Sequence, residues 1–260
     1  MAVNAGWLSA GINGLDPSTI RLSVLVGVIA CLYSAVGQAG ATGYVAALVV
    51  AGLPAEDLKA TALLLNVAVA AIGTLQFARA GHLHWQRVWP YVAGSVPMAA
   101  LGGFVQLNAR PFELLVGAIL LASSLRLMLK ARRGGPEQAC TPPAFSSALC
   151  SGAGIGLVGG LSGTGGGVIL SPLMLMKSWA PAAEVAATSV AFILCNSLAA
   201  LGGVFASQRQ LPTGILPLLM VVSVAGWLGS RLGSRLLSFR VLERWMAALI
   251  ALVGLKLLVG

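Results

Sequence analysis

The sequence predicts an all-α polytopic membrane protein made of two inverted repeats, each a Gly-broken re-entrant hairpin followed by three transmembrane helices. Of its 260 residues, 58% are hydrophobic and only 9% are charged, whereas soluble domains carry about 25% charged residues. The apolar stretches are long and recur, which favours helices over the weak alternation of an outer-membrane barrel. A dense glycine run, Gly159–Gly167, interrupts one of these stretches, and a weaker run lies at Gly37–Gly43.

The first half begins with a mixed segment, residues 1–15, that we expect at the surface. Asp16-Pro17 is typical of a helix N-cap followed by proline in the first helical position. An apolar segment then reaches Val36, and a second arm, Tyr44–Gly52, follows the first break. The three helices of this half are expected at about 57–78, 88–107 and 112–130.

The second half repeats this plan. Apolar sequence at 147–161 meets the long glycine run, and a second arm reaches Lys177. Helices are expected at about 183–206, 213–232 and 241–259. The predicted divisions are an N-terminal repeat at 1–130, a cytoplasmic linker at 131–146 and a C-terminal repeat at 147–260.

Residue identities align the two halves at two offsets. The larger offset pairs Pro54 with Pro181 and Ala60-Thr61 with Ala187-Thr188. A slightly smaller offset pairs Thr42-Gly43 with Thr164-Gly165. One gap between the first break and Pro54 reconciles the offsets, and we interpret the two glycine breaks as equivalent.

The positions of the basic residues favour inverted repeats. If each broken segment enters and leaves on one side, eleven of the 16 Lys and Arg residues face the cytoplasm and five face outside. If each broken segment crosses once, the split is nine against seven, a weaker positive-inside bias. The predicted cytoplasmic set is Arg79, Arg87, Arg126, Lys130, Arg132, Arg133, Lys177, Arg231, Arg235, Arg240 and Arg244.

The arms of the broken segments are expected to be half-helices that meet near the membrane midplane. An arm of about 16 residues spans about 24 Å, less than the roughly 30 Å hydrocarbon core. Residues 17–37 are nevertheless long enough to cross, so a re-entrant path and a full crossing both stay open.

Composition excludes several function classes. The net charge of +9 does not indicate a nucleic-acid partner, because no basic patch carries interleaved aromatic residues; the predicted surroundings are a lipid bilayer. The carboxylates all lie near predicted helix ends or in loops, and the two histidines, His82 and His84, are too few for a metal cage. We therefore expect no enzyme activity, no catalytic residues, no metal and no cofactor.

The glycine breaks carry the predicted binding site. A half-helix that begins at a break presents unpaired N–H groups and the positive end of its dipole, which bind anions without a buried Arg or Lys. Transporters with inverted repeats use broken helices in this way. The predicted substrate-binding residues are Gln38, Gly40, Thr42 and Gly43 of the first break, Ser162, Gly163, Thr164 and Gly165 of the second, and Thr61, Asn66, Thr188, Ser189 and Asn196 of the following helices.

Each of these features has a plainer explanation. The glycines can serve only to bring helices close together, as small residues commonly do in membranes. A single Ser or Thr side chain can bond the backbone of its own helix. The density of the glycine run favours the binding site over packing alone.

The stretch Gly159–Pro172, followed by Ala186-Ala187-Thr188-Ser189, resembles the signature of the TauE/SafE sulfite-exporter family. The resemblance covers about residues 18–260, although Ala41 and Tyr44 interrupt the first glycine run. It implies transport of sulfur-containing or organic anions, such as sulfite, thiosulfate, sulfoacetate and other sulfonates, across the bacterial inner membrane.

The resulting hypothesis is a multi-pass permease of the bacterial inner (cell) membrane that moves a small anionic substrate by alternating access. The direction of transport, the coupling ion and the oligomeric state stay open. The alternatives are a passive anion channel and a membrane assembly subunit that transports nothing.

Overall fold

The computed structural model describes residues 17–53, 55–105, 140–207 and 215–236, together with Leu121, Leu125 and six positions between 241 and 255. These parts of the chain are helical and contain no strand. The predicted helices at 112–130 and 241–259 lie almost entirely outside the described residues, as do the segment 1–15 and most of the linker.

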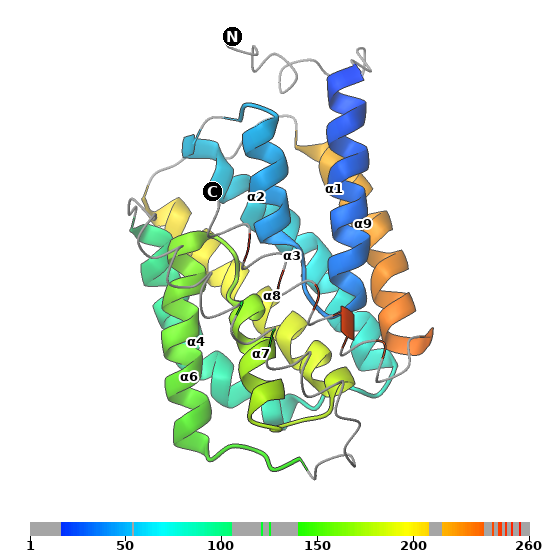
Figure 1. Ribbon diagram of the computed structural model, residues 1–260. Coiled ribbons are helices and arrows are strands. Elements are labelled where there is room, and N and C mark those ends of the chain that lie inside the picture. The colour runs from blue at the N-terminus through cyan, green and yellow to red at the C-terminus, as the bar shows by residue number, and fades with distance from the viewer. Residues whose placement is uncertain are drawn as a thin grey trace.

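The described helices follow the predicted order (Figure 1), and their ends fall within three residues of the predicted ends. This agreement follows from the long apolar stretches, whose polar and glycine-rich boundaries stop each helix. The elements are α1 (Pro17–Ala35), α2 (Ala41–Val50), α3 (Ala55–Arg79), α4 (Trp85–Phe104), α6 (Phe145–Ser162), α7 (Gly167–Met176), α8 (Ala182–Ala206), α9 (Leu216–Arg231) and the π-helical turn η2 (Leu232–Leu236).

The two helix breaks are present but shorter than predicted. They occupy residues 36–40, between α1 and α2, and 163–166, between α6 and α7. Positive φ angles occur at Gly37, Gly40, Gly163, Gly165 and Gly166, where a side chain would strain the backbone. Glycine is therefore required at these turns for its conformation.

Other predicted break residues belong to helices. Thr42 and Gly43 lie in the first turn of α2, and Ser162 is the last residue of α6. Gly159 and Gly160 also lie in α6, where Gly160 packs against the backbone of α4. The plainer explanation, close helix packing, therefore holds for this part of the glycine run.

The arms of each hairpin differ in length. The first arms, α1 and α6, have 19 and 18 residues and extend about 27 to 29 Å. The second arms, α2 and α7, have 10 residues each, or about 15 Å. The second arms therefore have the length expected of half-helices, whereas the first arms nearly match a membrane core of roughly 30 Å, the full crossing that the sequence left open.

The helix bounds repeat along the chain at a nearly constant offset. Helices α3 and α8 have 25 residues each and begin at Ala55 and Ala182, which matches the larger of the two predicted offsets. The start of α2 matches that of α7 at nearly the same offset, and the bond from Leu53 N to Leu48 O recurs there from Trp179 N to Met174 O. The smaller offset predicted for the breaks is therefore wrong, because glycine and threonine identities in this composition arise by chance.

Helices α3 and α8 pack together at the centre of the bundle (Figure 1). On one side α1 packs against α9, and on the other α6 packs against α4. Each first arm thus contacts a helix from the other half of the chain, and the two halves interlock. Glycines permit the close approach of α6 to α4; the contacting positions are Gly152 with Tyr91, Gly156 with Ser95 and Gly160 with Ala99.

The described surface carries large apolar side chains, such as Val24, Leu216 and Val224, each more than 60% exposed. Polar side chains, including Asn66 and Asn196, are fully buried. This distribution fits a bundle surrounded by lipid. The described helices long and apolar enough to cross a membrane are Asp57–Arg79, Phe145–Ser162, Ala182–Ala206 and Leu216–Leu236; Ile20–Ala35 and Gly167–Met176 are shorter apolar helices.

Candidate anion site at the two helix breaks

The two breaks meet inside the bundle through Gln38. This residue lies in the first break, and its Nε2 donates to the carbonyl oxygen of Gly167, the first residue of α7, at 3.2 Å. The same nitrogen lies 2.5 Å from Ser171 Oγ, and Ser171 Oγ lies 2.7 Å from Ser189 Oγ of α8. We call Gln38, Gly167, Ser171 and Ser189 the glutamine cluster; it joins the first break to α7 and α8, which lie more than 120 residues later in the chain.

Two asparagines hold the backbone of the second break. Asn66 of α3 donates from Nδ2 to the carbonyl oxygen of Thr164 at 3.4 Å. Asn196 of α8 donates to the next carbonyl, that of Gly165, at 3.3 Å. Both side chains are fully buried. Each asparagine also bonds a serine: Asn66 Nδ2 donates to Ser197 Oγ at 3.2 Å, and Ser95 Oγ donates to Asn196 Oδ1 at 2.6 Å.

The asparagine cluster, formed by Asn66, Asn196, Ser95 and Ser197, adjoins the glutamine cluster across one side chain. A Cβ on Gly165 would lie 3.0 Å from Ile193 Cγ2, and a Cβ on Gly167 would overlap the same side chain. Both glycines therefore keep space for Ile193, whose apolar side chain lies between the two polar clusters at the second break.

The backbone donors of the second break lie slightly later than predicted. The N–H groups of Thr164 and Gly165 already donate to the carbonyl oxygen of Gly159, at 3.0 and 3.4 Å. The first-turn N–H groups of a helix have no intrahelical acceptor. In α7 these include the groups of Gly167 and Val168, so these two N–H groups, rather than those of Thr164 and Gly165, are the candidate amide donors.

Most of the first break faces its own hairpin. Thr42 Oγ1 donates to Tyr33 Oη of α1 at 3.5 Å. Gly40 lies against the ring of Tyr44, and Gly43 lies against Ile29. Of the predicted residues of this break, Gln38 donates hydrogen bonds to the second hairpin, whereas Gly40, Thr42 and Gly43 pack against α1 or α2.

The remaining predicted residues divide into two groups. Thr61 and Thr188 are buried at corresponding positions of α3 and α8, and the Oγ1 atom of Thr61 has no hydrogen-bond partner among the described residues. Ser162 Oγ donates to the carbonyl oxygen of Val158 at 2.8 Å and lies 2.8 Å from Thr164 Oγ1. The plainer explanation, a bond to its own helix, thus applies to Ser162.

Three buried serines beside the candidate site were not predicted from the sequence: Ser95, Ser171 and Ser197. Each is 0% exposed and bonds a predicted site residue. A serine in an apolar helix most often bonds its own backbone, so its identity alone gives no signal. The sequence signal that could have pointed to Ser197 is its place directly after Asn196.

Lys59 is a further residue beside the second break. A Cβ on Gly163 would lie 3.1 Å from Lys59 Cγ, while Lys59 Nζ donates to the carbonyl oxygens of Gly102 and Gly103 at the end of α4, at 2.8 and 3.1 Å. Gly37 of the first break lies in the same way against Ala186. The two breaks thus pack on corresponding positions of α3 and α8.

The chemistry of the site is that of neutral amides and hydroxyls placed at a helix N-terminus. Such a site donates hydrogen bonds to an anion and adds the positive end of the α7 dipole. In the part of the chain that the structure describes, no three His, Cys, Asp or Glu side chains gather closely enough to hold a metal ion.

Comparison with known proteins identifies the family to which the chain belongs. Residues 22–257 match the protein family described as sulfite exporter TauE/SafE. The chain is 41% identical over 246 residues to the probable membrane transporter protein y4hK of Sinorhizobium fredii, covering 94% of this chain and 100% of that protein. It is 24% identical over 221 residues to the probable membrane transporter protein YunE of Bacillus subtilis, covering 76% and 79% of the two chains. No solved structure matches it.

Proposed function

The chain belongs to the sulfite exporter TauE/SafE family, a family of membrane transporters, and from this membership we propose that it is a permease for a small sulfur-containing or organic oxyanion. The substrate is of the sulfite or sulfonate class and crosses the bacterial inner membrane. The N-terminal end of the short arm α7 holds the anion beside Gln38 of the first break, and rocking of one repeat against the other exposes it alternately to the two sides.

The observation that carries this proposal is the contact between the breaks. Gln38 Nε2 of the first break lies 3.2 Å from the carbonyl oxygen at the start of α7, so the first break and the start of α7 share one buried region. Burial lowers the local dielectric constant, which strengthens the interaction of peptide dipoles with a charge. An anion at this place needs no buried Arg or Lys.

Helix directions support the inversion of the repeats. Helices α4 and α6 run parallel, since their contacts advance together from Tyr91 with Gly152 to Ala99 with Gly160. Helices α1 and α9 also run parallel, as do α3 and α9. Because the short connection at 80–84 reverses the chain between α3 and α4, α1 and α6 point in opposite directions (Figure 1). The parallel course of α1 and α9 follows from the contacts of Cys31 with Gly229 and Ala35 with Gly233. That of α3 and α9 follows from the contacts of Val69 with Gly226 and Gly73 with Ser230.

The basic residues support a cytoplasmic assignment for one end of the bundle. The loop between α3 and α4 contacts η2, because His82 Nε2 lies 3.2 Å from the carbonyl oxygen of Ser234. Arg87 at the start of α4 pairs with Glu184 at the start of α8. Arg79, Arg87, Lys177, Arg231 and Arg235 therefore gather at this end, as expected for a positive-inside protein.

We extend the same proposal to the domain plan, with repeats at 1–130 and 147–260 and a cytoplasmic linker at 131–146. In support, Thr141 N at the end of that linker donates to Ser178 O at 3.0 Å. Since Ser178 adjoins Lys177, the described part of the linker approaches the basic end.

Flux in proteoliposomes tests the proposed function. The purified full-length protein should accumulate or release sulfite or a sulfonate with saturable kinetics, whereas chloride at the same ionic strength should neither move nor compete. Flux that never saturates would favour the passive channel. If neither sulfite, sulfate, thiosulfate nor any sulfonate raises the melting temperature or crosses the membrane, the proposal is wrong and an assembly subunit is favoured.

A further inference from the structure

The side chain of Gln38 lies at the position where the proposed anion would meet α7. Its Nε2 faces two oxygens of α7, the carbonyl of Gly167 at 3.2 Å and the hydroxyl of Ser171 at 2.5 Å. Only 4% of the Gln38 surface is exposed. The carboxamide therefore fills the start of the second short arm although it belongs to the first break.

The other carboxamide atom, Gln38 Oε1, is buried and has no hydrogen-bond partner among the described residues. It lies 3.3 Å from the point that a Cβ of Gly167 would occupy, beside the first residue of the ten-residue helix α7. A partially negative oxygen thus sits at the positive end of the α7 dipole, close to N–H groups without an intrahelical acceptor.

This placement is unfavourable for a glutamine, since a buried carbonyl oxygen without a hydrogen bond loses its solvation without compensation. A ligand oxygen with full negative charge would interact more strongly with the same helix end. Gln38 is also carried by a short non-helical segment, residues 38–40, which a ligand can displace more easily than a helix.

We propose that the Gln38 carboxamide occupies the place of the anion when the transporter is empty, and that the ligand displacing it is a small oxyanion that also carries a hydrogen-bond donor. This inference rests on the proposed function and adds to it a substrate class and an internal competitor.

The need for a donor follows from the two atoms that Nε2 now faces. The Gly167 carbonyl oxygen can only accept a hydrogen bond, so an anionic oxygen placed opposite it would be repelled. A hydroxyl or a protonated oxyanion replaces both functions of the carboxamide, with one oxygen at the helix end and one donor toward Gly167. A dianion or an unsubstituted alkylsulfonate supplies an oxygen at the helix end but no donor toward Gly167.

Calorimetric titration of the purified full chain in lipid nanodiscs tests this, with 2-hydroxyethanesulfonate and ethanesulfonate as probes. The two anions have the same charge and differ by one hydroxyl. The variants are Gln38→Ala, Gln38→Met and Gln76→Ala. Gln38→Met keeps most of the side-chain volume and serves if the alanine variant does not fold. Gln76 is a buried glutamine of α3, 7% exposed, that belongs to neither cluster and serves as the control.

The wild-type chain should bind 2-hydroxyethanesulfonate about 2- to 10-fold more tightly than ethanesulfonate, the range expected for one net hydrogen bond. Loss of the competitor in either Gln38 variant should tighten binding of both anions, by roughly 3- to 10-fold. Gln76→Ala should leave both affinities unchanged.

Other outcomes separate this inference from the proposed function. If the wild type binds and the Gln38 variants bind equally or more weakly, Gln38 is a bystander or a ligand, and the internal competitor is rejected while the permease stands. Equal affinity of the wild type for both probes rejects the required donor. If neither the wild type nor a folded Gln38 variant binds any probe, both proposals fail.

Discussion

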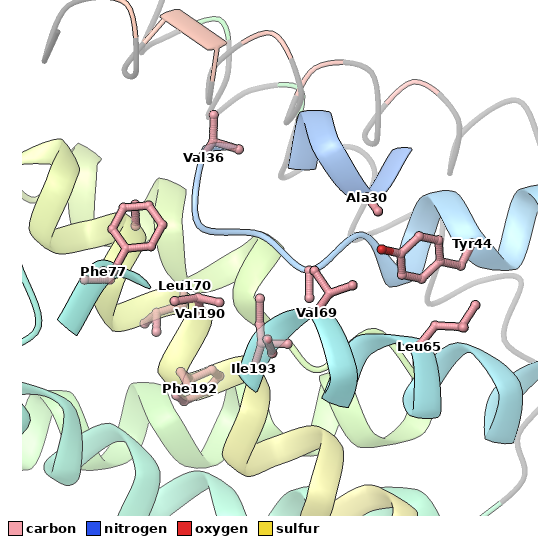
Figure 2. Close-up of a cluster of buried hydrophobic side chains, with 14 of the residues drawn as sticks. Ala30, Val36, Tyr44, Leu65, Val69, Phe77, Leu170, Val190, Phe192 and Ile193 are labelled. Atoms are coloured by element: carbon pink, nitrogen blue, oxygen red, sulfur yellow. The ribbon is translucent and has the colours of Figure 1, made fainter. Parts of the chain in front are cut away.

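Asn66 Nδ2 donates a hydrogen bond to the carbonyl oxygen of Thr164, which lies 98 residues later in the chain, at 3.4 Å. With Asn196, which bonds the next carbonyl, it fixes the backbone of the second break. In the repeat alignment that pairs α3 with α8, these asparagines correspond to Ile193 and Val69, which belong to the buried apolar cluster of Figure 2. The two asparagine bonds to the second break therefore have no counterpart at the equivalent positions, which carry apolar side chains.

Removal of the asparagine donors should destabilise the protein. Asn66→Asp keeps the side-chain shape but puts an oxygen opposite the Thr164 carbonyl, and Asn196→Ala leaves the Gly165 carbonyl without this donor. Each should lower the free energy of unfolding by about 1–3 kcal/mol, the cost of an unsatisfied buried polar group, and reduce flux. Thermal unfolding in detergent measures the change.

Ser223→Ala is the control for this pair of substitutions. Its Oγ donates to Leu219 O within its own helix, at 2.6 Å, and a change there should stay within about 0.5 kcal/mol. An asparagine variant as stable as the control would show that the break does not depend on these bonds.

Glycine at position 165 should be irreplaceable. Its φ is +71°, and a Cβ would lie 2.8 Å from Ser197 Oγ and 3.1 Å from Asn66 Nδ2. Gly165→Ala should therefore cost about 1–3 kcal/mol and lower flux, and Gly165→Leu should abolish flux. Gly202→Ala in α8, where the added Cβ meets nothing within 4 Å, should be neutral or stabilising by about 0.5–1 kcal/mol. Normal flux in Gly165→Leu would exclude this break as the site.

Chemical labelling of single cysteines tests the proposed topology. In a variant without Cys31, Cys140, Cys150 and Cys195, cysteines replacing Arg133 and Arg235 should both react from the cytoplasmic side. A cysteine at position 21 should react from outside. A membrane-impermeant maleimide applied to right-side-out and inverted vesicles makes the distinction. Labelling of positions 133 and 235 from opposite sides would contradict the inverted repeats; position 133 lies outside the described residues, so this experiment also places the linker.

The ion pair between Arg87 and Glu184 joins the two halves at the basic end but should add little stability. The side chains are 46% and 21% exposed, and pairs of this kind contribute about 0.2–1 kcal/mol. A double-mutant cycle with Arg87→Ala and Glu184→Ala should give a coupling energy in that range that falls with added salt. A coupling several times larger would mean that the pair is shielded from solvent in the membrane.

The helices were predictable because apolar stretches of membrane length leave little choice of conformation. The helix ends inside the glycine run were not predictable, because a glycine shows that the backbone has freedom but not whether the fold uses that freedom for a turn or for close packing. Gly165 supplies a positive φ, whereas Gly160 supplies close contact with α4. Only the packing of distant helices distinguishes these two roles.

The residues of the candidate site were predictable in part. Gln38, Asn66 and Asn196 stand out because amide side chains are costly to bury among apolar residues. Ser171 and Ser197 do not, because a hydroxyl can satisfy itself on its own helix. The register between the repeats was also mistaken in the breaks, where chance identities outweighed the hydrogen-bond pattern that fixes the true offset.

The proposal that the start of α7 binds an anion is tested most directly by locating an anion in crystals of the protein soaked with hydrogenselenite, whose selenium scatters anomalously. We expect an anomalous peak beside the start of α7, placed so that the oxygens of the anion accept hydrogen bonds from the N–H groups of Gly167 and Val168, with Gln38 moved away. A peak found only beside the arginines of the basic end, with the start of α7 still filled by Gln38, would contradict it.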